Sequence, residues 1–363
     1  MSKSGLRCDF RKGGGQLPHY LLEEVADLKA AIYKGIGKIE IEDIDTPTIQ
    51  VNEGLVKIGM VGVCGTDIKT FNKGHHMFKP PCILGHEFTG RIVEKGASVD
   101  RDFGDSRYVI APYIECGKCE MCQKGVPELC SKKFWVEGAF TEYVKVPSEI
   151  LERATLKIPD DVPESTATLT EPLACAIHGI DKARIKPEDR VLVVGSGPMG
   201  LLLGNALKNM RCETYISDVD KNRLSMAANC GLKTIDFSDS SFESFKKSQS
   251  RFDSIILAND KKELVNQLLP FVCPGGTFEL FGGMSRDTIL EIDPYFIHYK
   301  EVDLVGTFGF SEKDFKKAFG FITSDPDSFS RLISRVWDLE NIDEAFKDAI
   351  DKTKIKIVVK VSH

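Results

Sequence analysis

Apolar and polar residues alternate over short distances in the first 150 residues. The segments with this pattern are separated by glycine, proline or asparagine, which predicts short β-strands. They are LKAAIY (28–33), IEIEDI (39–44), LVKIGMVGVC (55–64), GRIVEKG (90–96), RYVIAPYI (107–114) and FTEYVKVP (140–147). The preceding LLEEVADL (21–28) has helical spacing instead. We therefore expect a β-rich region that ends near Pro147.

The pattern changes near Glu171, where EPLACAIHGIDKARI has the spacing of a helix. Buried strands then alternate with helical segments as far as TFELFG (277–282), an order typical of βαβ units and a parallel sheet. The last fifty or so residues contain two helical segments, KDFKKAFGFI and IDEAFKDAI, and the strand KIKIVVKV. The expected fold class is α/β, with a β-rich part and a doubly wound part.

Composition narrows the class of protein. The 363 residues suffice for about two domains of ~150 residues each. Acids outnumber bases, 54 to 48, which argues against a nucleic-acid partner. Apolar runs reach only about seven residues, far short of the ~20 that cross a membrane, and the N-terminus does not resemble a secretory signal. The eleven cysteines then indicate metal ligands or buried thiols in a reduced, cytoplasmic protein.

A glycine-rich turn, GSGPMG, lies between the buried strand RVLVV and the helical LLLGNALK. Its three glycines permit a tight turn, close approach of a pyrophosphate and close packing of helix on strand. Asp218 ends the next strand, where a carboxylate binds the adenosine ribose and repels the 2′-phosphate of NADP. We therefore expect NAD rather than NADP; a turn without a ligand is the alternative. The residues assigned to the cofactor are Gly195, Gly197, Pro198, Met199, Gly200, Asp218 and Arg223.

Four cysteines cluster as C-x2-C-x2-C-x7-C, at Cys116, Cys119, Cys122 and Cys130. Four thiolates at this spacing suit a closed tetrahedral zinc site with Zn–S bonds of ~2.3 Å. Because no coordination position stays open, this zinc would be structural and would hold a loop poor in apolar residues. An iron–sulfur cluster or four independent thiols are the alternatives, although the spacing is not the usual ferredoxin one.

A second group of potential metal ligands is dispersed along the chain. Cys64 lies in GVCGTD, His86 and Glu87 in LGHEFTG, and Glu171 in TEPLACAIHG. A thiolate, an imidazole and carboxylate oxygens can hold zinc and leave a position for water or substrate. Taken alone, each residue has a simpler interpretation, since a buried cysteine usually behaves as a small hydrophobe. Their occurrence together with the cysteine loop and the glycine-rich turn favours a zinc site.

These motifs together resemble the zinc-containing medium-chain dehydrogenase/reductase family, in its sorbitol and polyol dehydrogenase-like branch. GHEFTGRIVEKGASV has His86, Glu87, Gly90 and Gly96 at the offsets of the family's zinc signature, and CGTD, the cysteine loop, EPLACAIHG and GSGPMG occur in the family order. The resemblance covers Leu28 to the C-terminus. It implies a GroES-like β-rich catalytic domain (28–174 and 309–363), a Rossmann domain (175–308) and an N-terminal extension (1–27).

The resemblance also implies roles for the site residues. Catalytic zinc ligands would be Cys64, His86 and Glu171, with Glu87 as an alternate ligand or a supporting carboxylate. Asp67 would orient His86 through a hydrogen bond. Thr66 would hydrogen-bond the substrate hydroxyl and pass its proton outward. Zinc would make that hydroxyl acidic, so that hydride can pass to the nicotinamide.

Two positions depart from the family pattern. Many relatives have a histidine two residues after Asp67 to complete the proton relay, whereas this chain has Lys69. Sorbitol dehydrogenases have an arginine in G-x-F-R-Y that contacts the polyol, whereas this chain reads GTFGF with Gly309 at that place. His75 and His76 could border the pocket or be solvated, and His178 could pack at the domain junction.

The resulting prediction is an NAD-dependent enzyme with two zincs per chain that oxidises a secondary alcohol, in particular a polyol, sugar or cyclitol. Threonine, butanediol and simple alcohol dehydrogenases are alternatives within the family. A non-catalytic zinc- or NAD-binding protein is the alternative from another class. A homo-oligomer, either a dimer or a tetramer, is expected from the resemblance.

Overall fold

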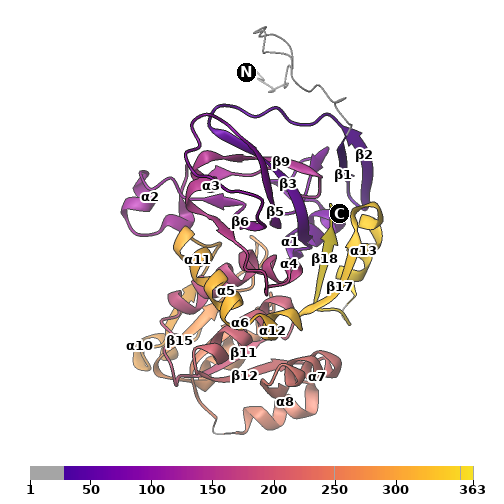
Figure 1. Cartoon of the computed structure of the whole chain (residues 1–363). Helices are drawn as coiled ribbons and strands as arrows, with labels where there is room; N and C mark the ends of the chain where they lie inside the picture. Colours follow the sequence, from indigo (N-terminus) through magenta and orange to yellow (C-terminus); the bar gives the residue numbers. More distant parts are fainter. Residues whose placement is uncertain (1–27, 249, 352, 363) are drawn as a thin grey trace, which may run out of the picture.

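The computed structural model describes residues 28–248, 250–351 and 353–362. A β-rich part and a parallel-sheet part lie one above the other in Figure 1, joined by helices. The predicted extension (1–27), and with it nearly all of the predicted helix at 21–28, lies outside the described residues; Leu28 already begins strand β1. None of the helices in the described ranges has the length and apolar character needed to span a bilayer.

The predicted strands of the first half form the β-rich part. Its largest sheet has the order β10-β6-β5-β3-β18-β17, and β9 also pairs with β3. These strands are β3 (Glu53–Gly62), β5 (Glu87–Lys95), β6 (Tyr108–Ile110), β9 (Tyr143–Pro147), β10 (Thr155–Lys157), β17 (Ile333–Asp338) and β18 (Lys356–Lys360). Since β18 pairs with β3, the end of the chain returns to the N-terminal half, as Figure 1 shows.

Two smaller sheets flank this one. The first is antiparallel, with the order β2-β1-β4. The second is the hairpin-like pair β7-β8, which lies close to the cysteine loop. Their strands are β1 (Leu28–Gly35), β2 (Lys38–Ile44), β4 (Cys82–Ile83), β7 (Tyr113–Ile114) and β8 (Phe134–Trp135).

The alternating pattern of the second half forms a six-stranded parallel sheet with the order β13-β12-β11-β14-β15-β16. In chain order this is 3-2-1-4-5-6, the doubly wound arrangement, with a reversal between β11 and β14 where ligands bind. The strands are β11 (Arg190–Val194), β12 (Glu213–Asp218), β13 (Lys233–Asp236), β14 (Phe252–Leu257), β15 (Val272–Leu280) and β16 (Asp303–Gly306). The predicted α/β fold class is confirmed.

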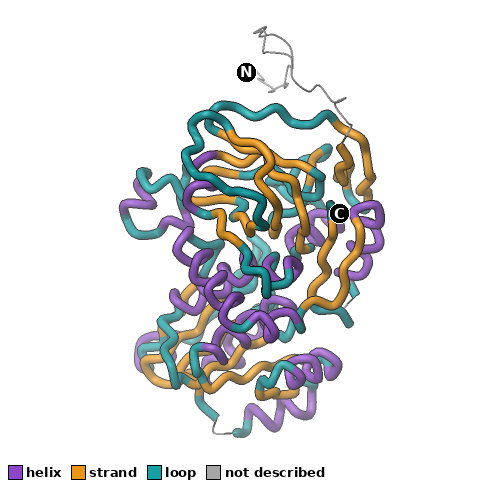
Figure 2. The backbone as a smooth tube through the Cα atoms, in the orientation of Figure 1, coloured by secondary structure: helices purple, strands orange, loops and turns teal. Residues whose placement is uncertain are grey.

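Helices flank the parallel sheet and join the two parts (Figure 2). They are α1 (Gly65–Lys73), α2 (Glu120–Gln123), α3 (Ser148–Arg153), α4 (Glu164–Ala167), α5 (Thr170–Lys182), α6 (Pro198–Asn209), α7 (Lys221–Asn229), α8 (Asp239–Lys246), α9 (Glu263–Leu268), α10 (Pro294–Tyr299), α11 (Glu312–Ser324), α12 (Pro326–Ser330) and α13 (Ile342–Ile350). Short 3-10 turns are η1 (Pro127–Leu129), η2 (Leu269–Phe271) and η3 (Leu339–Asn341).

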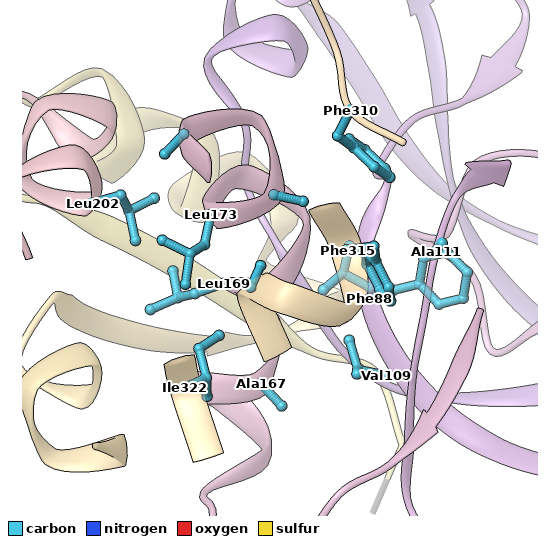
Figure 3. Close-up of a cluster of buried hydrophobic side chains, with 14 of the residues drawn as sticks. Phe88, Val109, Ala111, Ala167, Leu169, Leu173, Leu202, Phe310, Phe315 and Ile322 are labelled. Atoms are coloured by element: carbon cyan, nitrogen blue, oxygen red, sulfur yellow. The ribbon is translucent and has the colours of Figure 1, made fainter. Parts of the chain in front are cut away.

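One hydrophobic core runs from the β-rich part into the parallel-sheet part. Leu173 of α5 packs beside Leu202 of α6 on one side, and Phe88 and Phe315 lie on the other (Figure 3). Helix α5 also packs against α11. Because α5 begins at the β-rich part and ends at the parallel sheet, this buried packing holds its first turn, which contains Glu171, in place.

Candidate active site

The start of α1 brings Cys64 next to His86 and Glu87. Cys64 is the N-cap residue, and its sulfur accepts a hydrogen bond from the backbone N–H of Thr66 at 3.4 Å. One potential ligand atom from each of Cys64, His86 and Glu87 lies within 4.8 Å of the others. A thiol, an imidazole and a carboxylate at this separation are a donor set that fits zinc.

Asp67 supports this group from behind. Its carboxylate is buried; one oxygen accepts the N–H of Cys64 at 2.9 Å, and the other accepts the N–H of Gly85 at 3.3 Å and lies 3.5 Å from Nδ1 of His86. Burial lowers the pKa of His86, but the charges of Asp67 and Cys64 outweigh burial and raise that pKa well above its usual value. Since Nδ1 faces Asp67, Nε2 is the nitrogen available to a metal.

Glu87 forms a buried ion pair with Lys356 of β18. Burial lowers the pKa of Lys356, but Glu87 and Cys64 raise it and their effect prevails. Oε1 of Glu87 is also buried, and no described residue donates a hydrogen bond to it. A buried carboxylate oxygen without a donor is the kind of atom that a cation or a water would satisfy, so the site fits a metal on this observation as well.

Glu171 lies in the first turn of α5 and is buried. It is not part of the group of Cys64, His86 and Glu87, whose ligand atoms lie within 4.8 Å of one another. Burial raises the pKa of Glu171 to about 7, an effect that His86 opposes and Glu87 reinforces. One turn later, the sulfur of Cys175 lies 3.9 Å from Oε1 of Glu171. The carboxylate is therefore within electrostatic reach of His86 and Glu87, at the edge of the cluster.

The four cysteines of the loop are gathered into a second, closed group. Their sulfurs lie within 4.8 Å of one another, with three sulfur–sulfur distances of 3.5, 3.6 and 3.5 Å. A tetrahedron with Zn–S bonds of ~2.3 Å has edges of about 3.8 Å, so the group fits zinc. Backbone N–H groups of the loop donate to these sulfurs at 3.3–3.4 Å. Such donors also lower the pKa of Cys119 to about 5, which favours the thiolate that a metal requires.

The glycine-rich turn joins β11 to α6 as expected. A Cβ at Gly200 would collide with the carbonyl oxygen of Gly195, so only glycine fits there. Gly197 is the N-cap of α6 and has no side chain to cap the helix, which leaves N–H groups for a phosphate. Pro198 and Met199 follow as the first helical residues.

Asp218 lies beside this turn at the end of β12. One oxygen of its carboxylate accepts the N–H and the hydroxyl of Ser196 at 2.8 and 3.0 Å, and the other accepts the N–H groups of Val219 and Asp220 at 2.8 and 3.1 Å. Arg223 approaches the turn from α7, with a guanidinium nitrogen 3.4 Å from where a Cβ of Gly197 would be. Both a negative and a positive group therefore border the glycine-rich turn.

Other residues singled out from the sequence lie around α1. Thr66 is half-buried in its first turn, beside Cys64, whereas Lys69 is exposed. The rings of His75 and His76 lie 4.5 Å apart in the loop that follows. Neither of them is in the group formed by Cys64, His86 and Glu87.

His178 lies at the junction of three elements. Its Nδ1 is 3.3 Å from the carboxylate of Asp314 on α11, and its Nε2 is 3.7 Å from that of Glu128 in η1. Burial lowers the pKa of His178, but Asp314 and Glu128 raise it and prevail. The side chain therefore links α5 to α11 and to the cysteine loop.

Sequence reasoning missed two lysines, Lys356 and Lys133. Lys356 begins β18, directly before the buried apolar residues 357–359, and this is the signal that could have identified it. Lys133 gives no such signal, because two of the rings around it, those of Tyr113 and Phe308, come from distant segments of the chain.

Comparison with known proteins assigns both parts of the chain. Residues 50–160 match the alcohol dehydrogenase GroES-like domain, and residues 164–361 match the glucose dehydrogenase C-terminus. D-arabinitol dehydrogenase 1 of Uromyces fabae is 30% identical over 92% of this chain and 97% of its own length. L-galactonate-5-dehydrogenase of Escherichia coli (strain K12) is 31% identical over 76% of this chain and 82% of its own length.

The fold has a solved counterpart. A protein of Sinorhizobium meliloti 1021, assigned as a zinc-binding dehydrogenase and solved with NADP, matches with a TM-score of 0.83 and 26% identity over 93% of this chain and 100% of that one. The GroES-like domain and the zinc- and NAD(P)-dependent dehydrogenase class expected from the sequence are thus confirmed. The chain belongs to the zinc-dependent medium-chain dehydrogenase/reductase family, in its polyol dehydrogenase branch.

Proposed function

We propose that this enzyme oxidises a secondary hydroxyl of a polyol or related sugar alcohol with NAD. The observation that carries the proposal is the group formed by Cys64, His86 and Glu87, with Asp67 fixing the imidazole. Its relatives include enzymes named for arabinitol and galactonate. The alcohol loses a hydride to NAD and its hydroxyl proton to the protein, which gives a ketone, NADH and a proton.

Cys64 and His86 would hold the catalytic zinc with Glu171 or with the alternate ligand Glu87, and the cysteine loop would hold a structural one, which makes two per chain. Zinc in the first site would supply Lewis acidity to a substrate hydroxyl. Glu87 is paired with Lys356 beside the other ligands. Thr66, next to Cys64, would accept the hydroxyl proton and pass it to water, whereas Lys69 is exposed.

The cofactor would lie along the carboxyl ends of the parallel strands, with its pyrophosphate at the start of α6. Asp218 supports NAD over NADP, because a 2′-phosphate would approach its carboxylate. We place the catalytic domain at 28–174 and 309–363 and the Rossmann domain at 175–308. The thiolates that zinc needs support a reduced, cytoplasmic location.

We also propose that the enzyme is a dimer or a tetramer. Strand β16 is at the edge of the parallel sheet, and Ile289 and Tyr299 near it are 75% and 72% exposed. Large exposed apolar side chains beside an unpaired strand edge are typical of a subunit interface.

The test is NADH formation, followed at 340 nm, with a panel of polyols, sugar acids and small secondary alcohols. Thr66→Ala should lower kcat by about 10²- to 10⁴-fold, the usual contribution of a proton-transfer group. Lys73→Ala, at the far end of the same helix, is the control and should leave kcat unchanged. If no alcohol yields NADH from zinc-loaded protein, the proposed function is wrong.

A further inference from the structure

Lys133 lies against three aromatic side chains, of which Trp135 and Phe308 are exposed. Its ammonium nitrogen lies 4.1 Å from the ring centroid of Tyr113, 5.5 Å from that of Trp135 and 5.8 Å from that of Phe308. We call these four residues the Lys133 cage. Aromatic faces attract a cation and hold it in place, but they do not neutralise its charge.

The carboxylates of Glu115 and Glu128, which lie near Lys133, interact with other residues. Glu115 lies 3.7 Å from Arg153 and accepts the N–H of Glu312 at 3.1 Å. Glu128 lies 3.7 Å from His178. Within the described ranges, Lys133 itself has no carboxylate within ion-pair distance. The half-buried ammonium therefore has no direct ion pair, although Cys130 and Cys175 lie within electrostatic reach of it.

The cage borders the candidate active site. The Tyr113 hydroxyl accepts the N–H of Phe310 at 3.2 Å, and its ring stacks on that of Phe310. Burial raises the pKa of Tyr113 well above its usual range, and the nearby Cys175 and Glu171 raise it further. The phenol therefore lies within electrostatic reach of a candidate zinc ligand.

A cavity of about 390 Å³ lies beside Phe308, at the carboxyl ends of β15 and β16. Phe308 of the cage lines it together with His178 and Lys182. The carboxyl ends of parallel strands are where a doubly wound sheet binds its ligands. Tyr113 thus contacts Lys133 and lies within electrostatic reach of Glu171, and the cavity is lined by the carboxylate of Glu128 as well as by His178 and Lys182.

Gly309 leaves no room for a side chain beside Tyr113. Its φ is +67°, and a Cβ there would lie 2.7 Å from the hydroxyl of Tyr113. An arginine, which sorbitol dehydrogenases have at this place, would be strained and would clash with Tyr113. Residue 309 therefore carries no charge, and Lys133, which directly precedes β8, is a cation beside Tyr113.

We propose that the Lys133 cage binds a negatively charged group of the substrate, either a carboxylate or a phosphate, so that the enzyme prefers sugar acids or polyol phosphates over neutral polyols. This inference rests on the proposed function. The anionic group takes no part in the redox step; it only pairs with Lys133 and positions the carbinol carbon.

Two matched substrate pairs test the inference: D-arabinitol against D-arabinitol phosphate, and galactitol against L-galactonate. We expect kcat/KM for at least one anionic member to exceed that of its neutral partner by about 10- to 100-fold, which is typical of a hydrogen bond to a charged group. The pair with the larger ratio identifies phosphate or carboxylate. Higher salt should reduce the ratio.

Variants of Lys133 and Lys132 then test which residue causes the preference for the anionic substrate. Lys133→Gln should lower the anionic-to-neutral ratio by at least tenfold, whereas Lys133→Arg should retain most of it. Lys132→Gln, which removes the exposed neighbouring charge, is the matched control and should not change the ratio.

Two results would overturn the inference. Ratios near one in the wild type contradict it even if the variants fail to fold. A high ratio that persists in Lys133→Gln shows that another group binds the anion. Turnover of neutral polyols alone leaves the proposed function intact, whereas no turnover of any alcohol in the wider panel refutes the proposed function itself.

Discussion

Removal of the ammonium of Lys356 should destabilise the enzyme strongly. The Lys356→Met substitution keeps most of the apolar stem, so the main loss is the charge that faces Glu87. The two side chains are 5% and 0% exposed, and little water can replace the lost partner. Glu87 would then be a buried carboxylate without a counter-ion.

The expected cost follows from this burial. Breaking a buried ion pair by removal of one partner costs about 3–5 kcal/mol. An unfolding entropy of about 2.1 cal/mol/K per residue over 363 residues gives about 1.3 °C for each kcal/mol. The melting temperature of metal-free Lys356→Met should therefore fall by about 4–7 °C.

Differential scanning calorimetry of four proteins measures this effect: the wild type, Lys356→Met, Glu87→Gln and the double variant. The double variant replaces both charges by neutral groups, so it should recover most of the stability lost by Lys356→Met. The exposed ion pair between Lys124 and Glu120 is the control, since Lys124→Met should cost less than about 1 kcal/mol. A melting temperature of Lys356→Met within 1 °C of the wild type would refute the buried pair, as would a double variant no more stable than Lys356→Met.

Three further predictions concern the metals, the cofactor and pH. Cys119→Ser should lose one zinc and lower the melting temperature, whereas Cys64→Ser should abolish turnover and keep NAD affinity; equal effects in both variants would contradict two distinct sites. Asp218→Ala should narrow the ratio of kcat/KM for NAD to that for NADP, and a wild type that favours NADP would contradict the role of this carboxylate. Burial raises the pKa of Glu279 to about 7, so the folded state binds more protons than the unfolded state between pH 4.5 and 7. Glu279 should therefore lower the free energy of unfolding by about 3 kcal/mol as pH rises through this window, and Glu279→Gln should reduce the fall seen in denaturation curves by that amount.

The elements with a strong local pattern could be predicted from the sequence. LKAAIY and IEIEDI became β1 and β2, and the residues around GSGPMG became β11 and α6, because alternation and the glycine turn depend only on neighbours. Strands β13 and β16 were not predicted. Each has four residues with no clear alternation, and they form because a parallel sheet already provides an edge.

The residues of the candidate site also divide into those that the sequence predicts and those that it does not. Motifs identified Cys64, His86 and the four-cysteine loop, since metal ligands need particular residue types at short spacing. The partners of these residues could not be found in this way. Lys356 meets Glu87 only because β18 pairs with β3, and the Lys133 cage needs segments nearly 200 residues apart. Such contacts depend on topology, which spacing along the chain does not contain.

The most direct test of the central claim is a titration of zinc content against the rate of NADH formation with the best substrate. Wild-type protein should hold two zincs per chain. Gradual chelation should remove activity together with the more accessible zinc, and added zinc should restore it. Full activity in protein with no zinc, or with zinc in the cysteine loop alone, would contradict a zinc-dependent dehydrogenase.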